Sequence, residues 1–93
     1  MVNVILKLMT IIAADVGLSQ VEYSNVNILG EVIDSFMNEY GNKLRKSFVD
    51  QKGNLESHIV ILLNGRNHLF LDGMNTKLKD GDQIVLSPPL VGG

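Results

Sequence analysis

The residues with the clearest chemical potential close the sequence as Ser87-Pro88-Pro89-Leu90-Val91-Gly92-Gly93. Two consecutive glycines carry no side chains, so they can enter a narrow cleft where any Cβ atom would collide. A carboxylate at Gly93 can then approach a reactive phosphate, and ATP can activate it as an acyl-adenylate. We therefore predict that Gly93 is the reacting group and a substrate of another enzyme. The preceding residues form the recognised tail: Pro88, Pro89, Leu90, Val91 and Gly92.

No other set of residues forms a known catalytic pattern. The sequence has no Cys, which excludes disulfides, thiolate metal sites and Cys nucleophiles. It also has no Walker loop, no Gly-x-Ser-x-Gly and no His-x-x-x-His. His58 and His68 allow a metal pair, but two ordinary strand-edge histidines are the simpler interpretation. We expect no enzyme activity, no bound cofactor and no metal; ATP would belong to the activating enzyme.

Length and charge narrow the class of protein further. With 93 residues, of which 45% are apolar and 19% charged, the chain should fold as one small domain. Eight Lys and Arg against ten Asp and Glu give a net charge of -2, without the basic excess that nucleic-acid binding needs. A local basic group remains open to two interpretations, a solvated loop or a contact with an acidic partner: Lys43, Arg45, Lys46 and Lys52.

The apolar stretch from Val2 to Ala14 is interrupted by Lys7, and no basic segment precedes it. It is also shorter than the roughly 20 residues that a membrane-spanning helix needs. We therefore expect a cytoplasmic protein with no membrane partner.

The elements that must position the tail follow from hydrophobic periodicity in the first half of the chain. Val2, Val4, Leu6 and Leu8 alternate with other residues, which predicts an opening strand. Residues 10–16 predict a short helical turn that ends at Gly17, and residues 20–24 predict a second strand. The main helix is predicted over residues 28–40, capped by Asn25 or Asn27 and closed by Gly41 in the left-handed conformation. Its core face is Leu29, Val32, Ile33, Phe36 and Tyr40.

The second half begins with a long polar connection, residues 42–57, whose expected anchors are Leu44, Phe48, Val49 and Leu55. His58–Leu63 predicts a strand covered on both faces. Asn64-Gly65 predicts a hairpin turn with positive φ at both residues, so that His68–Leu71 returns antiparallel. Asp72, Asp80 and Asp82 stand beside glycines and are assigned to turns rather than to calcium binding. Gln83–Leu86 predicts the last strand, which Pro88-Pro89 stops.

The predicted order therefore indicates an α+β fold, a mixed sheet with one main helix packed on one face. Residues 1–89 form this domain, and residues 90–93 form a flexible tail.

Several of these segments together resemble the MoaD/ThiS family of ubiquitin-like sulfur carriers. The likeness runs through Leu63-Asn64-Gly65-Arg66-Asn67, Thr76 to Asp82 and Pro88 to Gly93, and the strand and helix of the first half fit it as well. The sequence looks most like the MoaD branch, the small subunit of molybdopterin synthase, and its archaeal relatives. It departs from that pattern at Ser87, where a bulky aromatic residue is common, and at Arg66–Met74, which is longer and more polar than in the shortest members.

The resemblance implies a β-grasp fold whose first and last strands are parallel neighbours. It also implies that a ubiquitin-activating-type enzyme adenylates Gly93 with ATP, after which sulfur converts the terminus to a thiocarboxylate. In the MoaD role, the tail enters the large subunit of molybdopterin synthase and donates sulfur to a pterin precursor of the molybdenum or tungsten cofactor. Without Cys, the terminal carbonyl is the natural place for transferable sulfur.

Two other functions remain open from the sequence. Some archaeal relatives act as ubiquitin-like modifiers, in which case Gly93 would be joined to Lys residues of target proteins. The chain could also be a β-grasp interaction module with an inert tail.

Overall fold

The computed structural model describes residues 1–89 of the chain. Within this range, the chain forms five strands, two α-helices and four short 3-10 turns. The strands and helices are β1 (Asn3–Leu8), α1 (Thr10–Val16), β2 (Gln20–Ser24), α2 (Leu29–Tyr40), β3 (Val60–Leu63), β4 (Arg66–Asn67) and β5 (Gln83–Ser87). The 3-10 turns are η1 (Gly41–Lys43), η2 (Lys46–Phe48), η3 (His68–Phe70) and η4 (Gly73–Asn75).

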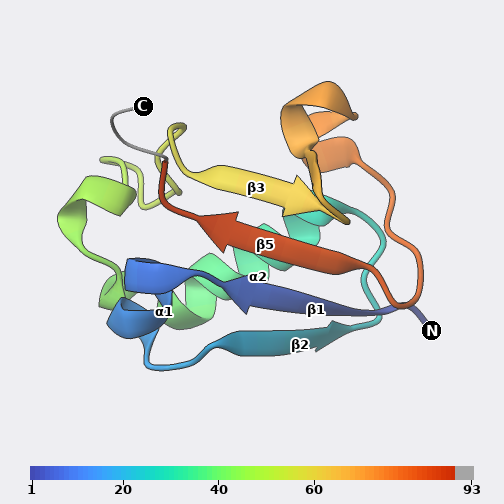
Figure 1. The fold of residues 1–93 in the computed structure, drawn as a ribbon, viewed down its shortest axis with the longest axis horizontal. Helices are drawn as coiled ribbons and strands as arrows, with labels where there is room; N and C mark the ends of the chain where they lie inside the picture. Colours follow the sequence, from blue (N-terminus) through green and yellow to red (C-terminus); the bar gives the residue numbers. More distant parts are fainter. Residues whose placement is uncertain (90–93) are drawn as a thin grey trace.

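The strands form one mixed sheet in the order β2-β1-β5-β3-β4, and α2 crosses behind it (Figure 1). β1 and β5 run parallel, with Leu6 opposite Ile84, whereas all other neighbouring strands are antiparallel. This is the ubiquitin-like β-grasp arrangement, so the predicted fold and the parallel pairing of the first and last strands are both confirmed.

The core lies between the sheet and α2. Alternate residues of β1 and β5 point inward, and Leu6, Ile84 and Leu86 have no exposed surface. From the other side α2 contributes Leu29 and Phe36, which are equally buried, together with Val32 and Ile33. The predicted core face is therefore confirmed for these four residues, as the helical period of 3.6 residues requires, whereas Tyr40 is half-buried at the edge of the core.

The ends of α2 differ from the prediction. The helix is capped at Ile28, not at Asn25 or Asn27, because the Glu31 carboxylate reaches back and accepts hydrogen bonds from the backbone N–H groups of Asn27 (2.7 Å) and Ile28 (3.0 Å). These two donors hold the pKa of Glu31 below its usual value. Gly41 has φ -57°, in the right-handed region, so the chain continues into η1 instead of ending in a left-handed turn.

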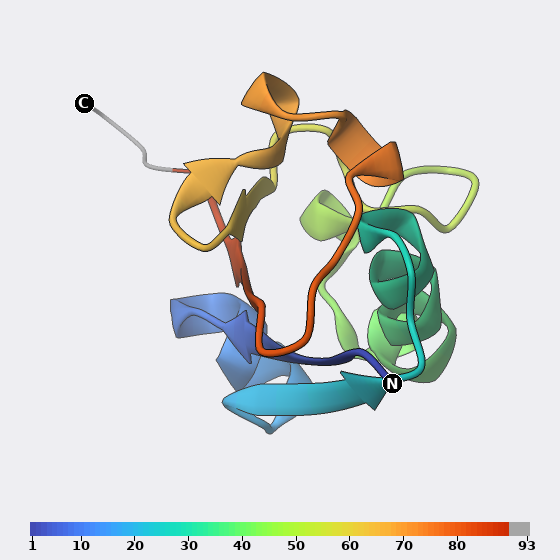
Figure 2. The ribbon, with the colours of Figure 1, turned by 90° about the vertical axis from the view of Figure 1, so that its right-hand side faces the viewer.

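The segment after β3 also departs from the prediction. Asn64 and Gly65 have φ of 50° and 86°, which confirms the hairpin turn. The returning strand β4 is only two residues long, because the Asn67 side chain accepts a hydrogen bond from the N–H of Leu69 (3.0 Å) and starts η3. The predicted strand over His68–Leu71 is therefore wrong. Figure 2 shows η3 and η4 (orange) between the β4 edge of the sheet and the start of α2.

Strand β3 begins at Val60, two residues later than predicted, and is not covered on both faces. Ile61 and Leu63 point into the core, whereas Val60 and Leu62 lie on the outer face and are half-buried. The long connection is anchored as expected, because Leu44 and Phe48 are buried and Val49 pairs with Leu55. Among residues 1–89, no helix has the length and apolar character needed to cross a membrane.

Candidate functional site at the end of strand β5

The segment that leads to the predicted reacting group leaves the sheet from its central strand. β5 has a neighbour on each side, parallel β1 and antiparallel β3. Its last bonds to β1 include the Met9 N–H, which donates to the carbonyl of Leu86 (3.0 Å). Because Leu86 is fully buried and paired on both sides, the point where the chain leaves the fold is held firmly.

Ser87, Pro88 and Pro89 form this exit point, which we call the tail root. Ser87 still pairs with Val60, and its hydroxyl donates to the carbonyl of Pro88 (3.0 Å). Neither proline has an N–H to donate, so the ladder ends here, as predicted. The other predicted site residues lie outside the described residues: Leu90, Val91, Gly92 and Gly93. Their flexibility and the reaction at Gly93 stay predictions.

An apolar rim lies beside the tail root. Since β1 runs parallel to β5, the end of β1 and the start of α1 lie next to the end of β5 (Figure 1). Met9 is 43% exposed and Ile11 is 40% exposed, and these two residues form the rim. Ile12 and Val16 point the opposite way and anchor α1 in the core. Contiguous exposed apolar patches mark partner surfaces in many proteins, which makes Met9 and Ile11 candidates for a partner contact.

The backbone at the rim is strained. Thr10 has φ 46°, in the left-handed region that β-branched residues rarely adopt. It directly follows Met9, whose N–H bonds to β5. The bend therefore turns the chain out of the sheet directly after β1, and Ile11 follows it as an exposed residue.

An ion pair fastens α1 to the long connection. Arg45 binds Asp15 with two bonds, from Nε to Oδ2 (2.9 Å) and from NH2 to Oδ1 (2.8 Å), and its backbone N–H also donates to Oδ2 (3.0 Å). These bonds lower the pKa of Asp15 from 3.8 to about 2. The Arg45 guanidinium also lies 5.5 Å from the centre of the Phe48 ring. Lys43 also makes a contact within the fold, because its ammonium group lies 5.9 Å from the centre of the Tyr40 ring. Two of the four basic residues in residues 43–52 therefore have partners within the protein.

The remaining candidate residues serve local structure. His58 faces the Phe48 ring at 6.5 Å, whereas Nδ1 of His68 lies 3.3 Å from the carbonyl of Ile61. Within the described range, no three His, Asp or Glu residues are grouped so that they could hold a metal ion. Asp80 accepts from the Asn3 N–H (2.8 Å) and Asp82 from the Lys79 N–H (2.7 Å), which confirms their assignment to turns.

The sequence did not predict the apolar rim. One signal was available, because Met9 and Ile11 extend the apolar run beyond the positions that the strand and the short helix need for the core. A helix of seven residues buries only one narrow face. Apolar residues off that face are therefore candidates for a partner surface.

Comparison with known proteins decides the family. The model of the ThiS family matches residues 10–93, nearly the whole chain. The chain belongs to the ThiS family. Members of this family are small ubiquitin-like carrier or modifier proteins, and the described part of the chain has their β-grasp fold.

Three relatives show how this ThiS-family chain compares with others. Small archaeal modifier protein 3 of Haloferax volcanii is 38% identical over 65 residues, which cover 70% of this chain and 68% of the relative. The solution structure of small archaeal modifier protein 1 from Methanosarcina acetivorans is 31% identical, with a TM-score of 0.80, and covers 100% of this chain and 98% of its own. A chain of the BexX/CysO complex of Amycolatopsis orientalis shares the fold, with 23% identity and a TM-score of 0.72 over 97% of this chain and 99% of its own.

Proposed function

We propose that this ThiS-family protein is a sulfur carrier whose reacting group is the carboxylate of Gly93, as the C-terminal residue of the working chain. The observation that carries the proposal is the tail root, where a buried central strand ends at Ser87-Pro88-Pro89, four residues before Gly93. A firmly held root defines where the tail starts. Four residues then span at most about 14 Å, which is the reach into a partner's active site.

The proposed chemistry takes place in a partner enzyme that binds ATP. A carboxylate oxygen of Gly93 attacks the α-phosphorus of ATP, and the bond to pyrophosphate breaks, which leaves an acyl-adenylate. A hydrosulfide-equivalent nucleophile then attacks the carbonyl carbon, and AMP leaves with the bonding electron pair. The product is a thiocarboxylate at Gly93. Gly92 and Gly93 allow the close approach of backbone and nucleotide, because no Cβ atom stands in the way.

The activating enzyme must also contact the folded domain. The apolar rim of Met9 and Ile11 fits this contact, since it adjoins the tail root and is exposed. Burying such a rim contributes binding free energy without touching the reacting end. The relative in the BexX/CysO complex shows that a protein of the same fold is found in a complex, which supports an enzyme partner here.

For the recipient of the sulfur, we propose the large subunit of molybdopterin synthase or a close analogue. The support is the resemblance of the segment from Asp80-Gly81-Asp82 through β5 and Pro88-Pro89 to the MoaD branch. In that role, the tail would deliver its thiocarboxylate to a pterin precursor in the active site of the large subunit.

A second candidate function is protein modification, with Gly93 joined to a target Lys through an amide bond. The 38% identity to small archaeal modifier protein 3 favours it. Both functions begin with the same acyl-adenylate and differ in the nucleophile, sulfur in one and a Lys amine in the other. Proteins from the native host that carry a Gly-Gly remnant on Lys would identify the modifier.

The test of the shared first step is ATP-dependent adenylation by the native activating enzyme. Appending one Ala after Gly93 moves the carboxylate by about 3.5 Å, beyond the tolerance of a reactive geometry. We expect this variant and the deletion of Gly92-Gly93 to lose adenylation while their unfolding curves match the unmodified chain. An Ala-extended chain that is adenylated at the normal rate would refute Gly93 as the reacting group.

A further inference from the structure

A pocket lies at the end of the molecule opposite the tail root. Residues from three segments line it: the hairpin after β3, the chain between η3 and η4, and the loop that leads into β5. It is a depression of about 330 Å³. Gln83 at the start of β5 and Ser87 at its end are four residues apart, which corresponds to about 13 Å of strand. We call this depression the distal pocket.

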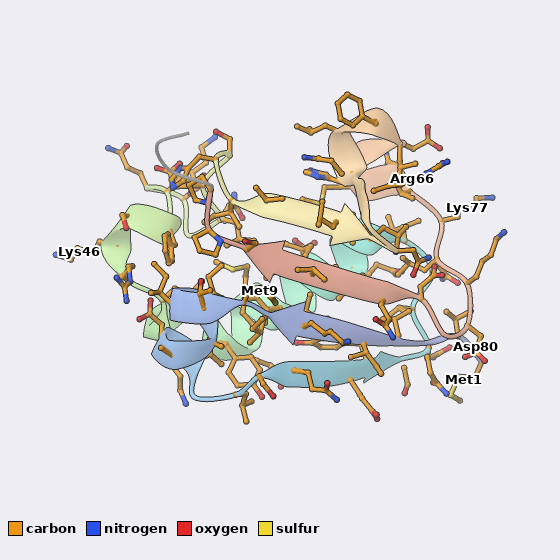
Figure 3. The ribbon with its side chains drawn as sticks, in the orientation of Figure 1. Met1, Met9, Lys46, Arg66, Lys77 and Asp80 are labelled. Atoms are coloured by element: carbon orange, nitrogen blue, oxygen red, sulfur yellow. The ribbon has the colours of Figure 1, made fainter. Side chains whose placement is uncertain are left out.

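The rim of the distal pocket is positively charged. Arg66, Lys77 and Lys79 all line it and are exposed. Figure 3 shows Arg66 and Lys77 at the end of the molecule opposite Lys46. Within residues 1–89, no ion pair joins any of these three cations to a carboxylate. Three of the eight Lys and Arg residues are therefore gathered at one site of a chain whose net charge is negative.

One carboxylate in the lining offsets part of this positive charge. Asp82 lines the pocket, but Oδ1 accepts from Asn64 Nδ2 (2.9 Å) and Oδ2 accepts from the Lys79 backbone N–H (2.7 Å). Asp80 binds the Asn3 N–H on the β1 side of the loop, and Asp72 is not among the residues that line the pocket. The lining residues therefore carry three positive charges against one negative charge.

The pocket also has an apolar part. Leu63 is buried and Leu71 is half-buried, and both line the pocket. Just before Leu71, η3 carries Leu69 (72% exposed) and Phe70 (87% exposed). A free phosphate or carboxylate ion would use the cations but not these apolar side chains. A peptide that combines acidic and apolar residues would use both.

The walls are held in place by the fold. The Asn64 side chain bridges the hairpin to β5, since its Oδ1 accepts from the Gln83 N–H (3.0 Å). Thr76 is buried, with its hydroxyl donating to the Gly73 carbonyl (2.7 Å) and accepting from the Asp72 N–H (3.0 Å). These bonds connect the loops that carry the cations, so the pocket is organised before any ligand binds.

We propose that the distal pocket binds an acidic, leucine-containing segment of a partner protein, with its carboxylates against Arg66, Lys77 and Lys79 and its apolar side chains against Leu71 and η3. The proposal does not depend on a reaction at Gly93. Because the pocket and the tail root lie at opposite ends of β5, one partner can hold the tail while another occupies the pocket. The site would therefore recruit a second protein to the tail-bound complex.

The test uses isotope-labelled protein and a short synthetic peptide of alternating Leu and Glu, followed by NMR titration. We expect shifts at residues 63–79 and binding that weakens as salt screens the charges. The double variant Arg66→Glu, Lys77→Glu should bind about tenfold more weakly, because two exposed ion pairs with the peptide are lost. Lys46→Glu, at the opposite end, is the matched control and should bind normally.

Each alternative result would overturn the proposal. Equal binding of a peptide with Gln in place of Glu would show that the charges are irrelevant. Displacement of the peptide by inorganic phosphate at equal concentration would indicate a simple anion site. Shifts confined to residues 43–52, equal weakening by Lys46→Glu, or no binding of the Leu-Glu peptide at all would show that the distal pocket is not the docking surface.

Discussion

The two ends of strand β5 face different tasks with different surfaces. At the Ser87 end, the chain leaves the sheet beside an apolar rim and an ion pair that is already formed between Arg45 and Asp15. At the Gln83 end, three cations that form no ion pair within residues 1–89 line a partly apolar pocket. The contact that we propose at the end leading to Gly93 is thus apolar, and the one that we propose at the other end is with an acidic segment. One rigid strand separates the proposed chemistry from the proposed recognition.

A cavity in the core beneath the sheet should have the largest effect on stability, because both ends of β5 depend on the same core. Phe36 is fully buried under the sheet, so Phe36→Ala should leave a cavity and lower the free energy of unfolding by about 3 to 5 kcal/mol. Denaturant unfolding measures this, and binding at both ends should fail together. Phe70→Ala is the matched control, because Phe70 is 87% exposed and its loss should change stability by less than about 0.5 kcal/mol. Equal losses in the two variants would contradict the assigned core.

A charge at the rim should affect only the tail end. Ile11→Asp introduces a carboxylate into the apolar contact, and we expect kcat/KM for adenylation to fall about tenfold, equivalent to roughly 1.4 kcal/mol. Leu69→Asp, at the other end, should leave this rate unchanged. If both variants slow adenylation equally, or neither does, the activating enzyme does not use the rim.

A residue with positive φ lies near each end of β5, and substitutions at these two positions should change the stability in opposite directions. Gly65 has φ 86° in the hairpin beside Arg66, so Gly65→Ala should destabilise by about 1 kcal/mol. Thr10 has φ 46° at the rim, and Thr10→Asn should stabilise by about 1 kcal/mol because Asn tolerates this region better. Thermal unfolding of the two variants measures both changes. A loss of stability in Thr10→Asn would mean that the strain at the rim is absent.

The smallest effect concerns acid stability at the tail end. The pKa of Asp15 is about 2 in the fold against an ordinary value of 3.8, so the folded state binds this proton less readily than the unfolded chain. The bonds to Arg45 therefore stabilise the protein above pH 3.8, and this contribution disappears as the pH falls to about 2. The stability difference between the unmodified chain and Asp15→Asn should be constant near neutral pH and shrink over that range. A difference that does not change with pH would contradict the ion pair.

The sequence predicted the features that depend on local backbone preferences, but not those that depend on competing side-chain hydrogen bonds. The turn at Asn64-Gly65, the stop at Pro88-Pro89 and the core face of α2 depend on local backbone preferences and simple periodicity, and all were predicted correctly. The cap of α2 was not, because the Glu31 side chain takes the N–H groups of Asn27 and Ile28, and the Leu29 N–H donates to the Thr76 carbonyl (2.9 Å). The strand expected over His68–Leu71 was wrong because one Asn67 hydrogen bond redirects the chain into η3.

The two proposed surfaces were harder to predict because they depend on tertiary structure. Arg66 and Lys77 stand eleven positions apart in the sequence and meet only because η3 and η4 fold between them. Lys43 and Arg45 lie two positions apart in the sequence and are exposed, but Lys43 contacts the Tyr40 ring and Arg45 contacts Asp15 and the Phe48 ring. The sequence left this basic group open between a solvated loop and a partner contact, so charge clustering along the sequence did not point to the distal pocket.

The most direct test of the central claim is the mass of the C-terminal peptide in protein purified from its native host. The account predicts that the mature chain ends at Gly93. A fraction of the chains should carry sulfur in place of one terminal oxygen. Addition of the large synthase subunit and pterin precursor should then consume this sulfur. A mature terminus at another residue would contradict it, as would a Gly93 carboxylate that stays unmodified in the presence of a competent activating enzyme and ATP.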